Sequence, residues 1–154
     1  MPNTPPTTGR VEWIGISRGH RQPIEPQAEV TVAIGTGVDG DYHSKKKPGG
    51  ERQVTLIQQE HLATIAANTG HNVVQPETLR RNIVVSGIEL ASLVGQQFHI
   101  GDAILEGTGP CTPCSRMDEN LGPGGRLAMK GLGGLTTTVI AAGRIRVGDP
   151  VLSK

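Results

Sequence analysis

The stretch Gln97-Phe-His-Ile-Gly-Asp-Ala-Ile-Leu-Glu106 decides the fold class. Two short runs with apolar residues flank Gly101-Asp102, a dipeptide typical of a tight turn between antiparallel strands. The stretch therefore predicts a β-hairpin. A similar run closes the chain, because Val147-Gly-Asp-Pro-Val-Leu152 resembles Ile100-Gly-Asp-Ala-Ile-Leu105. Two hairpin-like segments with the same turn indicate a mainly β fold, a closed barrel of short strands with a few short helices.

On both sides of this hairpin, most of the chain shows the alternation of apolar and polar residues and the β-branched residue types that are typical of strands. One helix is predicted, over Gln58–Asn68, with Gly70 as its stop, and its Leu62, Ile65 and Ala66 share a face that we expect to cover the barrel. A short helix or turn is predicted over 90–94, and loops over 18–26 and 35–52. The predicted strands are 11–17, 29–34, 53–57, 82–87, 97–100, 103–106, 134–142, 144–147 and 150–152.

Length and composition are those of one domain with an aliphatic core. The chain has 154 residues, with Phe, Tyr and Trp once each and 22 glycines, so Val, Ile, Leu and Ala must fill the interior. The polar residues 1–10 predict a disordered lead-in, and 11–154 a single domain. A net charge of +1 gives no general attraction to nucleic acid or membranes. With no apolar leader segment, a soluble cytoplasmic protein is the default expectation.

Two basic segments are candidate anion sites. The long predicted loop 35–52 contains His43 and the run Lys45–Lys47, and loops of this length are usually functional or disordered. The lysines can hold a phosphate, although a solvated charged loop is the simpler interpretation of a lysine run. Arg80 and Arg81 precede the strand that starts at Asn82, where guanidinium groups can fork onto phosphate or carboxylate. Solvent exposure is the alternative for both arginines.

Both cysteines of the chain follow the hairpin, in Cys111-Thr-Pro-Cys114. Thr112 is a suitable N-cap and Pro113 fits the first position of a short helix, which places Cys114 in the first helical turn. Backbone N–H groups and the positive end of the helix dipole favour a thiolate there, and Arg116 adds a nearby cation. Cys114 is therefore a candidate nucleophile, redox centre or soft metal ligand.

The residues alone allow several roles for the cysteine pair. Structural zinc is disfavoured, because it needs four ligands and the five histidines show no paired spacing. A thioredoxin-like dithiol needs a βαβ unit and a long helix, whereas Gly122-Pro123 stops any helix here. An inert buried pair, a ligand to a cofactor-borne metal and a sulfur-carrying thiolate all remain open.

Four segments, in order along the chain, resemble the MOSC family, named after the C-terminal domain of molybdenum cofactor sulfurase. They are Gly40-Asp-Tyr-His43 leading to Arg52-Gln-Val-Thr-Leu-Ile57, Leu79-Arg-Arg-Asn-Ile-Val-Val-Ser-Gly87, Phe98–Glu106, and Pro110-Cys-Thr-Pro-Cys-Ser-Arg116 with the closing Arg146–Val151. The resemblance implies a closed barrel related to the pyruvate-kinase β-barrel and binding of a molybdenum cofactor, a pterin that carries Mo.

Residue by residue, the resemblance implies a set of site residues. Cys114, not Cys111, matches the catalytic cysteine that ligates Mo in the reductases of the family. Arg80 and Asn82 match the segment that meets the pterin and its phosphate, Thr112 lines the cofactor, and His43 matches the G-D-x-H loop. On charge, Lys45 and Arg81 are further candidates for the phosphate.

These observations support three hypotheses. The first is a molybdenum-dependent oxidoreductase that reduces N-hydroxylated compounds, such as hydroxylamino bases and amidoximes, with electrons from a separate donor protein. The second is a sulfur-carrier or cofactor-handling module that uses a cysteine persulfide without turnover of its own. The third is a non-catalytic barrel with a structural cysteine pair.

Overall fold

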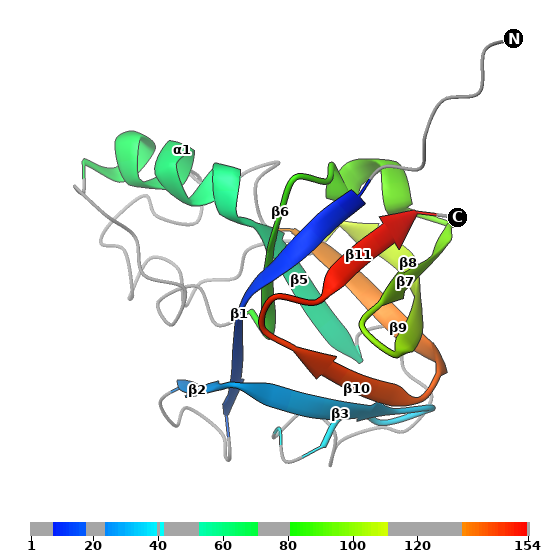
Figure 1. Cartoon of the computed structure of the whole chain (residues 1–154). Coiled ribbons are helices and arrows are strands. Elements are labelled where there is room, and N and C mark those ends of the chain that lie inside the picture. The colour runs from blue at the N-terminus through cyan, green and yellow to red at the C-terminus, as the bar shows by residue number, and fades with distance from the viewer. Residues whose placement is uncertain are drawn as a thin grey trace, which may run out of the picture.

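The computed structural model describes residues 8–17, 24–39, 41, 53–70, 81–110 and 134–153. Figure 1 shows how their elements are arranged. In chain order they are β1 (Thr8–Ser17), β2 (Ile24–Gln27), β3 (Glu29–Ala33), β4 (Gly37–Val38), β5 (Val54–Gln58), α1 (Gln59–Thr69), β6 (Ile83–Ser86), the 3-10 helix η2 (Leu90–Leu93), β7 (Gln97–Ile100), β8 (Ala103–Pro110), β9 (Leu135–Ala141), β10 (Gly143–Arg146) and β11 (Pro150–Ser153).

Seven strands close into a barrel, which confirms the predicted fold class. The ring runs β1, β11, β7, β8, β9, β5, β6 and back to β1, and β2 extends β1 outside the ring (Figure 1). All neighbours in the ring are antiparallel except β5 and β6, which are joined through α1. The strands β10, β3 and β4 form a separate small sheet. Closure leaves no free edge in the ring.

The hairpin predicted over 97–106 is present as β7 and β8. Ile100 pairs with Ala103 across the turn, and Gly101 has a φ of +55°. The prediction that the similar run at the end of the chain is a second hairpin is wrong, because β10 pairs with β3 while β11 pairs with β7 and β1. The residue that corresponds to Ala103 is Pro150, which has no N–H to donate back across such a turn.

The two Gly-Asp turns instead lie against each other. A Cβ on Gly101 would stand 2.6 Å from Asp149 Oδ2 and 2.7 Å from the Arg144 carbonyl oxygen. Asp102 N–H donates to that same carbonyl at 3.0 Å. The turn that follows β10 therefore seals one end of the β7–β8 hairpin and directs β11 back into the barrel.

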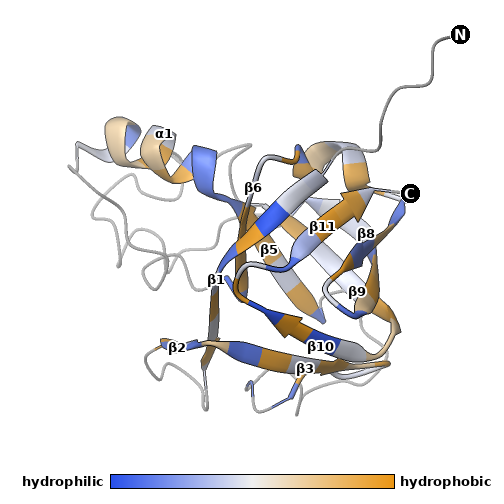
Figure 2. Cartoon of the chain, viewed as in Figure 1, coloured by the Kyte–Doolittle hydropathy of each residue, from blue (hydrophilic) through white to orange (hydrophobic). Residues whose placement is uncertain are grey.

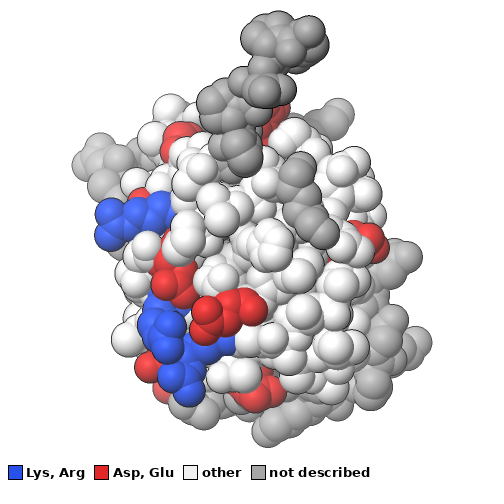
Figure 3. Space-filling view, turned by 45° about the vertical axis from the view of Figure 1, so that its right-hand side comes forward, with Lys and Arg blue, Asp and Glu red and all other residues white. Residues whose placement is uncertain are grey.

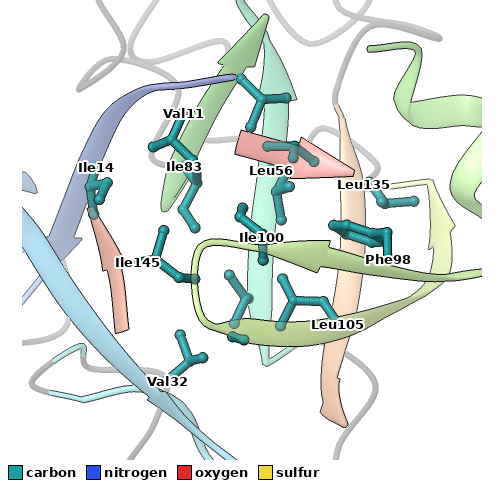
Figure 4. Packing of buried hydrophobic residues seen from close by; sticks show 14 of the residues in the cluster. Val11, Ile14, Val32, Leu56, Ile83, Phe98, Ile100, Leu105, Leu135 and Ile145 are labelled. Atoms are coloured by element: carbon teal, nitrogen blue, oxygen red, sulfur yellow. The ribbon is translucent and has the colours of Figure 1, made fainter. Parts of the chain in front are cut away.

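Aliphatic side chains fill the barrel, as the composition predicts (Figure 4). Phe98, Ile14, Leu56, Ile100 and Leu105 are each fully buried. Figure 4 shows them converging with Val11, Ile83 and Leu135 of the ring and with Val32 of β3 and Ile145 of β10, so the small sheet contributes to the same core. In the small sheet, the residues of β3 are alternately exposed and buried, and Figure 2 shows the matching alternation in hydropathy.

The helix α1 covers the outer face of the barrel, as predicted. Its Ile65 and Ala66 are buried with Ile57 of β5 and Val84 of β6, and Leu62 and Trp13 pack beside them. Gly70 ends the helix with a φ of +76°, in the left-handed region that glycine adopts most easily. Because β5 and β6 are buried on both faces, consecutive residues are apolar in each strand, Leu56-Ile57 in β5 and Ile83-Val84-Val85 in β6.

Several boundaries differ from the predicted ones. The strand β1 begins at Thr8 rather than Val11, and residues 1–7 lie outside the described residues. The strand β2 lies partly inside the predicted loop 18–26, and β4 inside the predicted loop 35–52, where both form short pairings. The short helix or turn predicted over 90–94 is confirmed as η2. No helix in the part of the chain that the structure describes is long and apolar enough to cross a membrane.

Candidate functional site

The segment that carries both cysteines starts and ends on paired neighbouring strands. β8 ends at Pro110, which pairs with Leu135 at the start of β9. The residues between them, 111–133, lie outside the described residues, and so do His43, Lys45 and Arg80. The structure therefore defines where the segment of Cys111, Thr112 and Cys114 leaves the barrel and returns to it.

A cavity of about 440 Å³ opens at this point. Its wall combines the end of β5, the start of α1, η2 and the two ends of the cysteine segment. Of the described residues, those that line it are Gln58, His61, Glu89, Leu90, Ala91, Val94, Pro110, Gly134 and Leu135. The volume lies within the usual range for small-molecule sites, roughly 300–1,000 Å³. Both residues that flank the cysteine segment, Pro110 and Gly134, thus belong to the wall of one cavity.

Two glycines allow backbones to approach closely beside the cavity. Gly134 has a φ of +98°, and a Cβ there would stand 1.9 Å from the Leu56 carbonyl oxygen. A Cβ on Gly107 would stand 2.2 Å from the carbonyl oxygen of Leu93, the last residue of η2. Any side chain at either position would push neighbouring backbone away from the wall.

A β-bulge precedes the cysteine segment. The β8–β9 register shifts between Gly107 and Gly109, so that Thr108 is the extra residue. Its hydroxyl lies 2.7 Å from the Thr136 hydroxyl, which also donates to the Gly109 carbonyl at 3.1 Å. Bulges bend a strand and increase its twist. This one, held by the two threonines, sets the direction in which the chain leaves at Pro110.

Polar side chains hold the α1 and η2 ends of the cavity together. Gln58 Oε1 accepts the Leu90 N–H at 2.9 Å, and Glu60 Oε2 accepts the Gly87 N–H at 3.0 Å. Partial burial disfavours the charged form of the Glu60 carboxylate. Four interactions outweigh this effect: hydrogen bonds from the Gly87 N–H, from the N–H of Glu60 itself and from the Gln58 side chain, and the charge of nearby His61. The pKa of Glu60 therefore lies below its ordinary value of 4.5.

Two ion pairs lie elsewhere on the described surface. Arg144 contacts Glu29 at 3.0 Å, and Arg146 lies 3.9 Å from Asp102. Figure 3 shows basic and acidic side chains next to one another on the face that it presents. The described residues bring no group of three or more His, Cys, Asp or Glu side chains together in a way that can hold a metal ion.

Comparisons with known proteins assign the family. A family model described as the MOSC domain matches residues 37–152, which is most of the chain. The chain belongs to the MOSC family. The resemblance noted in the sequence is thereby confirmed, and MOSC domains are associated with binding of the molybdenum cofactor. No curated protein sequence matches the chain.

Solved structures share the MOSC fold of this chain. The YUAD protein from Bacillus subtilis superposes with a TM-score of 0.83 at 23% identity, over 97% of this chain and 98% of that one. YiiM from Geobacillus stearothermophilus gives 0.76 at 19% identity, over 95% and 75%. YiiM from Escherichia coli gives 0.70 at 19% identity, over 94% and 69%. At these identities the likeness establishes the fold.

Asn82 and Ile83 of this MOSC domain lie near the strand ends that flank the cysteine segment. Pro110, Leu135, Leu56 and Ile83 form one row across β8, β9, β5 and β6. Asn82 adjoins that row, two strand spacings from Leu135, which is about 10 Å across the sheet. Arg81 is only 4% exposed, so solvent exposure is excluded for this arginine.

Asn82 itself is a buried connection between strands. Its Oδ1 accepts the Thr55 N–H and the Thr55 hydroxyl, both at 3.2 Å, and its Nδ2 donates to the Gly15 carbonyl at 3.3 Å. An asparagine amide can accept two hydrogen bonds and donate two. At most one N–H of the side chain therefore remains for a ligand, and the predicted cofactor role of Asn82 stays a prediction.

Replacing Asn82 with alanine is expected to destabilise the fold by about 3 kcal/mol, because buried groups of Thr55 and Gly15 lose their partner. Urea unfolding followed by circular dichroism measures this loss. Thr55→Val, which removes one hydroxyl and keeps the amide of Asn82, should cost only about 1 kcal/mol. Equal stability of Asn82→Ala and the wild type would show that these hydrogen bonds do not hold β1, β5 and β6 together.

The sequence interpretation missed the cavity residues Gln58, His61, Glu89 and Gly134. His61 was one of five histidines without paired spacing, and Gln58 and Glu89 stood outside every motif. Their common feature is position, since they lie where β5, β6 and β9 meet α1 and η2. Only the pairing of these strands brings them to the ends of the cysteine segment.

Proposed function

We propose that this MOSC domain binds a molybdenum cofactor at the cavity beside the cysteine segment and reduces N-hydroxylated compounds there. The observation that carries the proposal is that both residues flanking the cysteine segment line one cavity. Pro110 and Gly134, which flank the segment with Cys114, line a cavity of about 440 Å³ in a chain of the MOSC family. The proposed Mo ligand is the Cys114 thiolate.

The described lining suits the flat part of such a cofactor. Leu90, Ala91, Val94, Pro110 and Leu135 are apolar, and Gly134 presents backbone without a side chain. A flat heterocycle packs well between surfaces of this kind. The phosphate of the cofactor needs cations, which the described lining does not include. We assign that task to Arg80, Arg81 and Lys45, with His43 and Thr112 beside the pterin.

When bound, the cofactor would supply the metal through which electrons reach the substrate. The chain itself holds the cofactor, orients the substrate against it and limits water. The helix start predicted at Thr112-Pro113 keeps Cys114 ionised, which a metal ligand requires. The electron donor is expected to be a separate protein, and the product is the amine or amidine.

Metal and pterin analysis of the isolated protein tests this function. Protein made in a host that synthesises the cofactor should carry about one Mo and one pterin per chain. It should reduce a hydroxylamino base or an amidoxime with a chemical electron donor. Protein without Mo and without pterin would contradict the proposal.

The alternative function gives a different result in intact mass spectrometry. A sulfur-carrier module would show an adduct of about 32 Da, one sulfur atom, on Cys114, which a reducing agent removes. Such an adduct in protein that lacks Mo would favour the carrier. Thiols unreactive toward an alkylating agent, with neither Mo nor the adduct, would favour the non-catalytic barrel.

A further inference from the structure

His61 is one of three lining residues, with Gln58 and Glu89, that the proposed function has not used. Among the described residues around the cavity, it is the one whose side-chain type changes charge between pH 5 and 8. It lines the cavity and is only partly buried, so solvent can still return a proton to it. A proton donor for repeated turnover needs both properties.

The helix fixes the position of His61. It is the third residue of α1, whose next turn is anchored on the barrel by Ile65 and Ala66. The start of the helix is tied to the end of β6 by the bond from the Gly87 N–H to Glu60. Side chains placed by a packed helix hold their geometry better than side chains on free loops.

Two acidic residues belong to this region among the described residues. Glu60 precedes His61 on α1, and Glu89, in the connection from β6 to η2, lines the same cavity. Gln58 at the end of β5 is neutral, and the described lining contains no lysine or arginine. The low pKa of Glu60 keeps that carboxylate ionised throughout the range in which histidines titrate.

We propose that His61 is the general acid of the reduction, giving its proton to the hydroxyl oxygen of the bound substrate. The inference rests on the proposed function and names a residue that acts in it. Reduction of R–NH–OH to R–NH2 and water consumes two electrons and two protons and breaks the N–O bond. The electrons come from the reduced donor. His61 supplies the proton that lets the oxygen leave as water, and solvent supplies the proton on nitrogen and reprotonates His61.

The first test needs no cofactor. Histidine ring signals of the cofactor-free protein are followed by NMR across pH 5 to 9, with and without benzamidoxime. An oxygen that accepts a hydrogen bond from the imidazolium should raise the midpoint of His61, whose signals His61→Gln identifies. His99, which is exposed on β7 and does not line the cavity, should not respond. An unchanged His61 midpoint in excess benzamidoxime would overturn the assignment.

The second test uses the loaded enzyme with reduced methyl viologen as donor. His61→Gln should retain the Mo content of the wild type and lose about 100-fold in rate near pH 6.5. The fall in rate as histidine deprotonates should also disappear. His99→Gln should match the wild type. A His61→Gln enzyme with normal Mo and the wild-type pH profile would refute the role of His61 and leave the proposed function standing, whereas wild-type protein without Mo would refute the function itself.

Discussion

Replacing Cys114 with serine is expected to empty the protein of molybdenum. A serine hydroxyl remains protonated at neutral pH and is a hard, poor ligand, whereas a thiolate suits a thiophilic metal. We expect Mo per chain to fall by roughly tenfold or more, and the reduction of amidoximes to disappear with it. Metal analysis of protein purified from a cofactor-producing host measures the loss. The pterin content, measured on the same sample, shows whether the organic part of the cofactor still binds.

Cys111→Ser is the matched control, because it makes the same chemical change three residues away. Cys111 precedes the predicted cap at Thr112 and lacks the support of the helix start. Its serine variant should therefore keep Mo and most of the activity. Complete loss of Mo in Cys111→Ser, or normal Mo in Cys114→Ser, would contradict the asymmetry between the two cysteines.

Gly134→Ala is expected to cost roughly 3–5 kcal/mol of the free energy of unfolding. The added methyl group meets two penalties. Gly134 has a φ of +98°, which L-residues seldom adopt, and the new Cβ would stand 1.9 Å from the Leu56 carbonyl oxygen. Because that neighbour is backbone in a central strand, it cannot rotate away. The wall of the cavity must shift, so we also expect Mo retention to fall in the protein that still folds.

Gly95→Ala separates the two penalties. Gly95 also has a positive φ, +77°, but a Cβ there would meet nothing within 4 Å. Its alanine variant should lose only about 1 kcal/mol, from backbone conformation alone. Urea unfolding of both variants at one pH gives the comparison. If Gly134→Ala and Gly95→Ala are equally stable, the close approach of β9 to β5 does not constrain the fold.

The sequence by itself determined the local elements of this MOSC domain. It predicted the 97–106 hairpin and the helix that ends at Gly70, because neighbouring residues encode both elements. It also predicted the helix face of Leu62, Ile65 and Ala66. The family was also recognised from the sequence, because four of its motifs occur in order along the chain. Cys114, Thr112, Arg80, His43 and Lys45 remain predictions of this kind, since they lie outside the described residues.

Only the tertiary structure decided which strands pair and what they bring together. The sequence predicted a final hairpin, yet β10 joins β3 and β11 closes the barrel against β1. Likewise, nothing local to His61 or Gly134 indicates that they line one cavity with Pro110. The physical reason is the distance along the chain between the residues that interact. Turns and helix faces depend on contacts a few residues apart, whereas strand partners and cavities depend on burying apolar surface between segments distant in the chain.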